Sequence, residues 1–172
     1  CVTVTGLASK LISGVLAVTS LVPIPALAMF IGLFLTMFCC IVLGMGVPTT
    51  ANFCIMASTC APILIKMGLP DMAAYFFVFY FGIVADIPPP VALAAYAGAA
   101  IAKANPMKTG VNATKLAIAA FIVPYIFAYS PAMLFINVGS WLEVVQIILS
   151  ALLGLFGIAA ALNGHLFRHI PW

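Results

Sequence analysis

Apolar residues run almost without interruption along this chain, and polar residues gather in a few short stretches between them. A membrane-spanning helix needs about 20 apolar residues, because each residue advances it by about 1.5 Å through a hydrocarbon core about 30 Å thick. Residues 24 to 43, 117 to 137 and 141 to 163 are long enough. Pro124 and Pro131 are expected to kink or end the second helix. The pattern predicts an all-α polytopic membrane protein.

Two backbone breaks separate shorter apolar stretches in the middle of the chain. The first is "GMGVPTT", residues 44 to 50, and the second is "DIPPP", residues 86 to 90. Prolines remove backbone donors and push the preceding residue out of the helical region. Irregular backbone at membrane depth is tolerated only where it is buried in protein or lines a cavity, and secondary transporters build binding sites from such broken helices. We therefore interpret the two breaks as parts of one site.

Each break also has a purely structural explanation. An ordinary loop between two full spans would explain "GMGVPTT", and a surface turn would explain "DIPPP" and its carboxylate. Against these alternatives, residues 51 to 65 make only a marginal span, and the break recurs at 86 to 90. A lone carboxylate inside a membrane also points to function.

The ends of the broken helices carry partial charges of opposite sign, and each sign suits a different kind of ligand. A helix that ends near Leu43 or Asp86 leaves carbonyls unpaired, and a helix that begins near Thr50 or Pro90 offers free N–H groups. Carbonyl oxygens suit a hard cation such as Na⁺, and helix N-termini suit a substrate carboxylate. The predicted cation ligands, mostly through backbone carbonyls, are Gly44, Gly46, Thr49, Thr50, Asp86, Ile87 and Pro88. The predicted substrate contacts are Thr50, Ala51, Asn52, Pro89, Pro90 and Val91.

Composition and charge agree with a membrane protein and indicate its orientation. Hydrophobic residues make up 66% of the chain and charged residues 5%, whereas soluble domains carry about 25% charged residues. The net charge of +3 is too small for a nucleic-acid-binding face. Lys103, Lys108 and Lys115 fall in one connection, and Arg168 lies near the C-terminus. The positive-inside rule predicts that the 103 to 115 loop and the C-terminus are cytoplasmic.

The remaining reactive residue types do not form a recognisable catalytic or metal site. The five cysteines lie in apolar runs without a CxxC motif, which is typical of small buried hydrophobes rather than disulfides. His165 and His169 have helical metal-ligand spacing, but no third ligand is near, and a tail at the headgroup level explains them better. The three acidic residues are widely separated, so we do not expect an enzyme.

Three long segments resemble the membrane subunit of TRAP transporters. They are "LGMGVPTTANF", "YFFVFYFGIVADIPPPVALAAYAGAAIAKANPMKTG" and "KLAIAAFIVPYIFAYSPAMLF". The resemblance covers roughly residues 1 to 137 and is closest to the TAXI branch, in which the two membrane components are fused. It implies an elevator-type secondary importer that works with a periplasmic substrate-binding protein and a cation gradient, usually Na⁺, with no other cofactor. H⁺ coupling stays open because of Asp86.

The resemblance also implies an architecture. The large subunit has two inverted halves, each with a re-entrant hairpin and a broken helix, and this chain would be most of the second half. Its partners would then be the N-terminal half, the small membrane component and the lipid bilayer. The implied parts are an incoming segment and connector helix at 1–23 with a truncated start, a hairpin at 24–66 with its tip at 44–50, a broken helix at 70–104 interrupted at 86–90, and transmembrane helices at 116–137 and 141–163.

The expected function is that of a permease component of a cation-coupled importer, in a bacterial or archaeal cytoplasmic membrane. Its substrates would be small organic carboxylates delivered by the binding protein. The alternative is a passive channel or a structural membrane subunit without a transport site of its own. One residue departs from the family, which commonly has threonine where this chain has Pro88, so a hydroxyl ligand is lost there.

Overall fold

The computed structural model describes residues 7–21, 23–136, 138–163, 165–166 and 168–169. The chain divides into two compact units, Cys1–Ala85 and Asp86–Trp172. The boundary falls at the start of the second predicted break. We describe each unit by itself.

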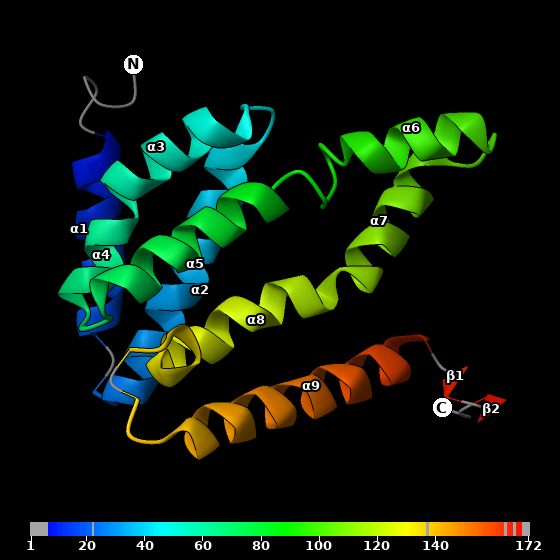
Figure 1. The fold of residues 1–172 in the computed structure, drawn as a ribbon. Helices are drawn as coiled ribbons and strands as arrows, with labels where there is room; N and C mark the ends of the chain where they lie inside the picture. Colours follow the sequence, from blue (N-terminus) through cyan, green and yellow to red (C-terminus); the bar gives the residue numbers. More distant parts are fainter. Residues whose placement is uncertain (1–6, 22, 137, 164, 167, 170–172) are drawn as a thin grey trace. The chain divides into compact units, whose positions relative to one another are not determined.

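The first unit is a cluster of five helices, one of which, α5, packs against three of the others (Figure 1). They are α1 (Leu7–Ser20), α2 (Pro25–Gly44), α3 (Thr49–Thr59), α4 (Ala61–Lys66) and α5 (Asp71–Val84). Helix α5 packs against α2, α3 and α4, and α1 packs against α2. Proline at the start of α2 and of α4 favours helix initiation, because the N–H that it lacks would have no partner there.

The interior of the first unit is apolar and closely packed, whereas its outer face carries large exposed side chains. Leu33, Met56, Phe77 and Phe81 are fully buried, and the rings of Phe77 and Phe81 lie 4.8 Å apart between centroids. On α2, exposed phenylalanines recur every four residues at positions 30, 34 and 38. An apolar outer stripe of this kind is suited to lipid or to another membrane helix rather than to water.

The second unit contains the remaining elements. They are α6 (Leu93–Ile101), α7 (Pro106–Leu116), α8 (Ile118–Tyr129), the 3₁₀ helix η1 (Pro131–Leu134), α9 (Trp141–Asn163), and the two-residue strands β1 (His165–Leu166) and β2 (Arg168–His169). Helices α6 and α7 pack together, and α8 runs beside α9 (Figure 1). The described secondary-structure elements are therefore all helices apart from this one short antiparallel strand pair, which confirms the all-α membrane class.

Three helical segments are long and apolar enough to cross a membrane: Pro25–Gly44, Pro106–Tyr129 and Trp141–Leu162. The first and third agree with the stretches read from the sequence. The second starts and ends earlier than 117 to 137, because α7 and α8 are interrupted only at Ala117 and because a separate 3₁₀ turn begins at Pro131. Pro124 lies inside α8 without ending it.

The helical spacing considered for His165 and His169 is absent. The two residues are register partners in β1 and β2. Among the residues that the structure describes, no group of three histidine, cysteine or acidic residues is placed to hold a metal ion.

Candidate functional site

The first break is a tight turn between two helices. Helix α2 ends at Gly44, α3 begins at Thr49, and the Val47 N–H donates to the Gly44 carbonyl at 3.3 Å. Gly46 has a φ of 74°, in the left-handed region that only glycine adopts without strain. Pro48 occupies the N-cap position of α3, so the two threonines that follow do not cap this helix and are exposed.

Asn52, in the first turns of α3, is the polar centre of this region. Its side chain is fully buried, and Nδ2 donates to the Gly82 carbonyl at 2.8 Å. Gly82 lies in the last turn of α5, where carbonyls lack a partner within the helix, so Asn52 caps that helix end. The other amide atom, Oδ1, is buried and has no hydrogen-bond partner among the described residues. Leaving a buried acceptor unpaired costs about 1–3 kcal/mol, so its retention calls for a functional explanation.

Small residues let the helices approach Asn52 this closely. A Cβ added at Gly44 would lie 2.5 Å from Asn52 Nδ2 and 2.8 Å from the Ala85 Cβ, and one added at Gly82 would lie 3.5 Å from Asn52 Nδ2. Any larger residue at Gly44 would therefore force α2 away from α3 and α5. We call Gly44, Asn52, Gly82 and Ala85 together the Asn52 junction.

The Asn52 junction is rich in acceptors. The C-terminal ends of α2 and α5 both lie there, and each carries partial negative charge. The free amide oxygen of Asn52 adds a neutral acceptor at the same place. Oxygen atoms of this kind are the ligands that hard cations prefer. The first turn of α3 also leaves N–H groups without helical partners, which suit an anion.

The second break spans the residues between α5 and α6. Asp86 to Pro89 are half-buried, and Pro90 is exposed. Proline 90 was expected to open the next helix, but α6 begins at Leu93, because Ala92 before it adopts a left-handed conformation with φ 31° and ψ 42°. The Pro89 side chain lies against α7, where a Cβ added at Gly110 would be 3.1 Å from the Pro89 Cγ.

A family model described as the DctM component of the tripartite ATP-independent periplasmic transporter matches residues 1–142 of the chain. The chain belongs to this family. No match was found among curated proteins or among solved structures. The matched residues include both breaks and every described helix up to the first residues of α9. The resemblance to the large membrane subunit of TRAP transporters is thereby confirmed, and the chain is a multi-pass membrane component of such a transporter.

The structure of this DctM component places the predicted site residues in two groups. Gly44, Gly46 and residues 49–52 lie in the first unit, and residues 86–91 lie in the second. The gathering of both groups into one site stays a prediction. Within the first unit, sequence reasoning missed Gly82 and Ala85, whose only signal was the presence of small residues at the end of an otherwise bulky apolar helix.

Proposed function

We propose that this DctM component binds a coupling cation at the Asn52 junction and a small organic carboxylate beside it, and imports both. The observation that carries the proposal is the fully buried Asn52 Oδ1, which has no hydrogen-bond partner among the described residues and lies where two helix C-termini meet. A cation would satisfy this oxygen and the unpaired carbonyls together. The family match supports the proposal, because the family is a membrane component of a transporter.

Na⁺ is the cation that the chemistry of the junction favours. Asp71 is the single acidic residue between residues 7 and 85, and it is exposed in the first turn of α5, at the opposite end of that helix from Gly82 and Ala85. Amide and carbonyl oxygens do not titrate, so they bind a metal cation more readily than they carry a proton. Coupling to H⁺ is the alternative, because the second predicted break contains the carboxylate of Asp86. Pro88 would contribute only its backbone carbonyl.

The substrate is proposed to bind through its carboxylate at helix N-termini. The first turn of α3, at Thr50 and Ala51, and the start of α6 after Val91 both present N–H groups to an anion. A periplasmic binding protein would deliver the substrate to the hairpin from outside the cytoplasmic membrane. The lysine-bearing loop at 103 to 115 would then be cytoplasmic, and an elevator motion of the hairpin would carry the site across.

Uptake by reconstituted protein tests this function. The full-length permease and its binding protein are placed in proteoliposomes, and carboxylate uptake is measured with a Na⁺ gradient, with a H⁺ gradient and with neither. We expect saturable uptake that requires Na⁺ and the binding protein. Uptake that is indifferent to every cation gradient would show that the transporter is not a symporter. Flux without the binding protein would support a passive channel.

Gly46 in the hairpin turn provides a second test. No atom lies within 4 Å of a Cβ added there, so Gly46→Val has space, but its φ of 74° makes valine strained. We expect this variant to insert normally and to lose uptake. Gly14→Val, in α1, is the control, because a Cβ at Gly14 also meets nothing within 4 Å. Wild-type uptake by Gly46→Val would count against the turn as part of the site.

A further inference from the structure

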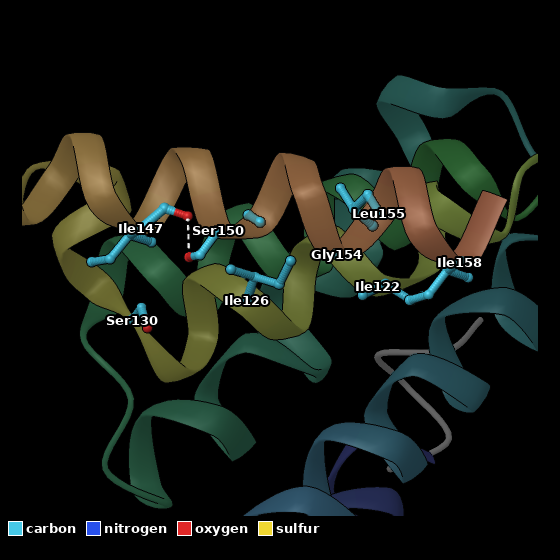
Figure 2. Close-up of a pocket in the computed structure, with 9 residues that line it drawn as sticks. Ile122, Ile126, Ser130, Ile147, Ser150, Gly154, Leu155 and Ile158 are labelled. Carbon is cyan, nitrogen blue, oxygen red and sulfur yellow. Dashed lines mark hydrogen bonds between the residues drawn. The ribbon is translucent and has the colours of Figure 1, made fainter. Parts of the chain in front are cut away.

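A polar pocket where α8 turns into α9 shares no residue with the proposed transport site. Its volume is about 320 Å³, near the lower end of the range for small-molecule sites, about 300–1,000 Å³. Glu143 and Ile147 come from α9, and the other lining residues come from the end of α8 and the turn after it: Tyr129, Ser130, Pro131, Ala132 and Ile136. In Figure 2, Ser130 and Ile147 lie at one end of a neighbouring apolar groove, which they also border. We call the polar pocket the Glu143 pocket.

The carboxylate of Glu143 is the charged group of this lining, and helix capping does not occupy it. Ser140 is the N-cap of α9: its Oγ accepts from the Leu142 N–H at 3.2 Å and its carbonyl accepts from the Glu143 N–H at 3.1 Å. A capping box would add a bond from the Ser140 N–H to the Glu143 carboxylate. That bond is not formed, and the carboxylate has no hydrogen-bond or ion-pair partner among the residues that the structure describes.

The chain supplies no basic side chain near Glu143 along the sequence. Between Lys115 and Arg168 there is no lysine or arginine. Lys115 belongs to α7, which precedes α8, and Arg168 belongs to β2, beyond the other end of α9. A carboxylate beside two candidate membrane spans is costly without a counter-charge. The counter-charge is therefore expected from a molecule outside this chain.

The end of α8 adds further hydrogen-bond acceptors to the pocket. The Met133 N–H donates to the Ser130 carbonyl at 3.0 Å, so it does not serve the Tyr129 carbonyl one residue earlier. Carbonyls at a helix C-terminus carry partial negative charge when no donor follows them. The Ser130 hydroxyl also lines the pocket and can accept a hydrogen bond. The pocket thus combines one negative charge with several acceptors, which favours a cation that carries its own donors.

The aromatic ring in the lining favours an organic cation over a metal ion. Tyr129 lines the pocket and is 48% exposed, so its ring is open to a ligand. The face of a tyrosine ring attracts ammonium groups. Ca²⁺ and Mg²⁺ need about six or more oxygen ligands closely around the ion, and a single carboxylate does not provide them in a pocket of about 320 Å³. A carboxylate beside an aromatic ring suits an ammonium group, whose N–H groups can bond to the surrounding acceptors.

The position of the pocket along the candidate spans places it at the level of lipid headgroups. One span ends at Tyr129 and the next begins at Trp141. Trp141 is 74% exposed, and its ring lies 5.8 Å from that of Phe135 between centroids. Tyrosine and tryptophan at the ends of spans are typical of the membrane–water interface. Ammonium groups reach this level both as ethanolamine headgroups of phospholipids and as free amines from the water.

We propose that the Glu143 pocket binds a primary ammonium group, with the Glu143 carboxylate as its counter-charge and the Tyr129 ring against the cation. The ammonium group belongs either to an ethanolamine phospholipid or to a free alkylamine, and the recognition chemistry is the same for both. Glu143 directly follows the last residue that the family model matches. The proposal does not depend on the cation site at the Asn52 junction, because the two sites share no residue.

Cross-linking with a membrane-permeant carbodiimide tests the proposal, because this reagent joins a carboxylate to a contacting primary amine as an amide and is itself converted to a urea. The full-length permease is placed in phosphatidylcholine vesicles that contain phosphatidylethanolamine, or in phosphatidylcholine alone with ethanolamine in the buffer. Peptide mass spectrometry locates the amides, and the N-acylurea formed without amine corrects for the reactivity of each carboxylate. We expect at least about tenfold more amide at Glu143 than at Asp71 in one or both arms. Asp71 is the matched control, since it is exposed in the first turn of an apolar helix, α5, and does not line this pocket.

The aromatic ring is tested by substitution. Tyr129→Leu should lower the amide yield at Glu143 about fivefold and leave its N-acylurea yield unchanged. Tyr75→Leu, at an exposed tyrosine on α5, is the control and should change neither yield. Amide with phosphatidylethanolamine alone would identify the lipid as the source, and amide with ethanolamine alone would identify the free amine; both results support the site. Equal corrected yields at Glu143 and Asp71 in both arms, or a yield at Glu143 that Tyr129→Leu does not lower, would overturn the proposal.

Discussion

The Asn52 junction and a groove of about 290 Å³ between α8 and α9, lined by Ile122, Ile126, Gly154 and Leu155, use glycine in opposite ways. At the junction, a Cβ on Gly44 would collide with a buried amide 2.5 Å away, so the glycine brings helix ends into contact. In the groove, a Cβ on Gly154 would meet nothing within 4 Å, so the glycine leaves space. The first arrangement fixes polar atoms in one geometry, as selective ion binding requires. The second leaves an open apolar surface.

The largest expected effect is a methyl group added at Gly44. Gly44→Ala should destabilise the permease by about 1–3 kcal/mol, because the new methyl group would lie 2.5 Å from the buried, hydrogen-bonded Asn52 amide and 2.8 Å from the buried Ala85 Cβ. Uptake should fall at least about tenfold as the junction opens. Thermal unfolding in detergent and proteoliposome uptake measure the two effects.

Gly154→Ala is the matched substitution in the groove. It should stabilise the permease by up to about 1 kcal/mol, since alanine favours a helix interior over glycine and nothing surrounds the new methyl group. If both alanine variants lost stability to the same extent, the contrast between a packed junction and an open groove would be wrong.

The second-largest effect is expected from removing the Asn52 amide. Asn52→Leu removes the hydrogen bond to Gly82 and the free oxygen, so we expect a destabilisation of about 1–3 kcal/mol. If Oδ1 is a cation ligand, the Na⁺ concentration for half-maximal uptake should also rise about tenfold or more. Cys54→Ala, at an exposed position on the same helix, is the control. A less stable variant with an unchanged Na⁺ requirement would make Asn52 a structural residue only.

Local sequence rules predicted where the backbone breaks lie better than they predicted which residues pack against them. Glycine and proline marked the turn at 44 to 50 and the break at 86 to 90, because these residues act through their own backbone. The approach of Gly82 and Ala85 to Asn52 depends on how α5 crosses α2 and α3, and no local pattern contains that information.

Proline did not always end a helix within the apolar segments. Pro124 stays within α8, whereas Pro131 begins a separate 3₁₀ turn. Transmembrane helices tolerate proline where neighbouring groups satisfy the freed carbonyl, and this is a tertiary property. The same dependence on surroundings explains why α6 begins at Leu93 rather than at Pro90.

The third effect concerns the left-handed residue in the second unit. Ala92 has a φ of 31°, a conformation that costs a residue with a Cβ about 1–2 kcal/mol and costs glycine little. Ala92→Gly should therefore stabilise the permease by up to about 1 kcal/mol. Ala99→Gly, at a buried position within the regular part of α6, should destabilise it by about 1 kcal/mol. Thermal unfolding of the two variants should shift in opposite directions, and a shared destabilisation would contradict the strained conformation at Ala92.

The smallest effect tests α7, the helix that carries Lys108 and Lys115. Asn105 caps α7, where its side chain accepts a hydrogen bond from the Lys108 N–H at 3.2 Å. Asn105→Ala should cost about 1 kcal/mol, and the cost should be local, because the first turn of α7 is exposed. Hydrogen exchange at Lys108 should accelerate while exchange in α3 and α5 stays slow. Asn112→Ala, on an exposed site in the middle of α7, should leave exchange at Lys108 unchanged. Na⁺-driven uptake should be unaffected by Asn105→Ala, because the change is confined to the first turn of α7.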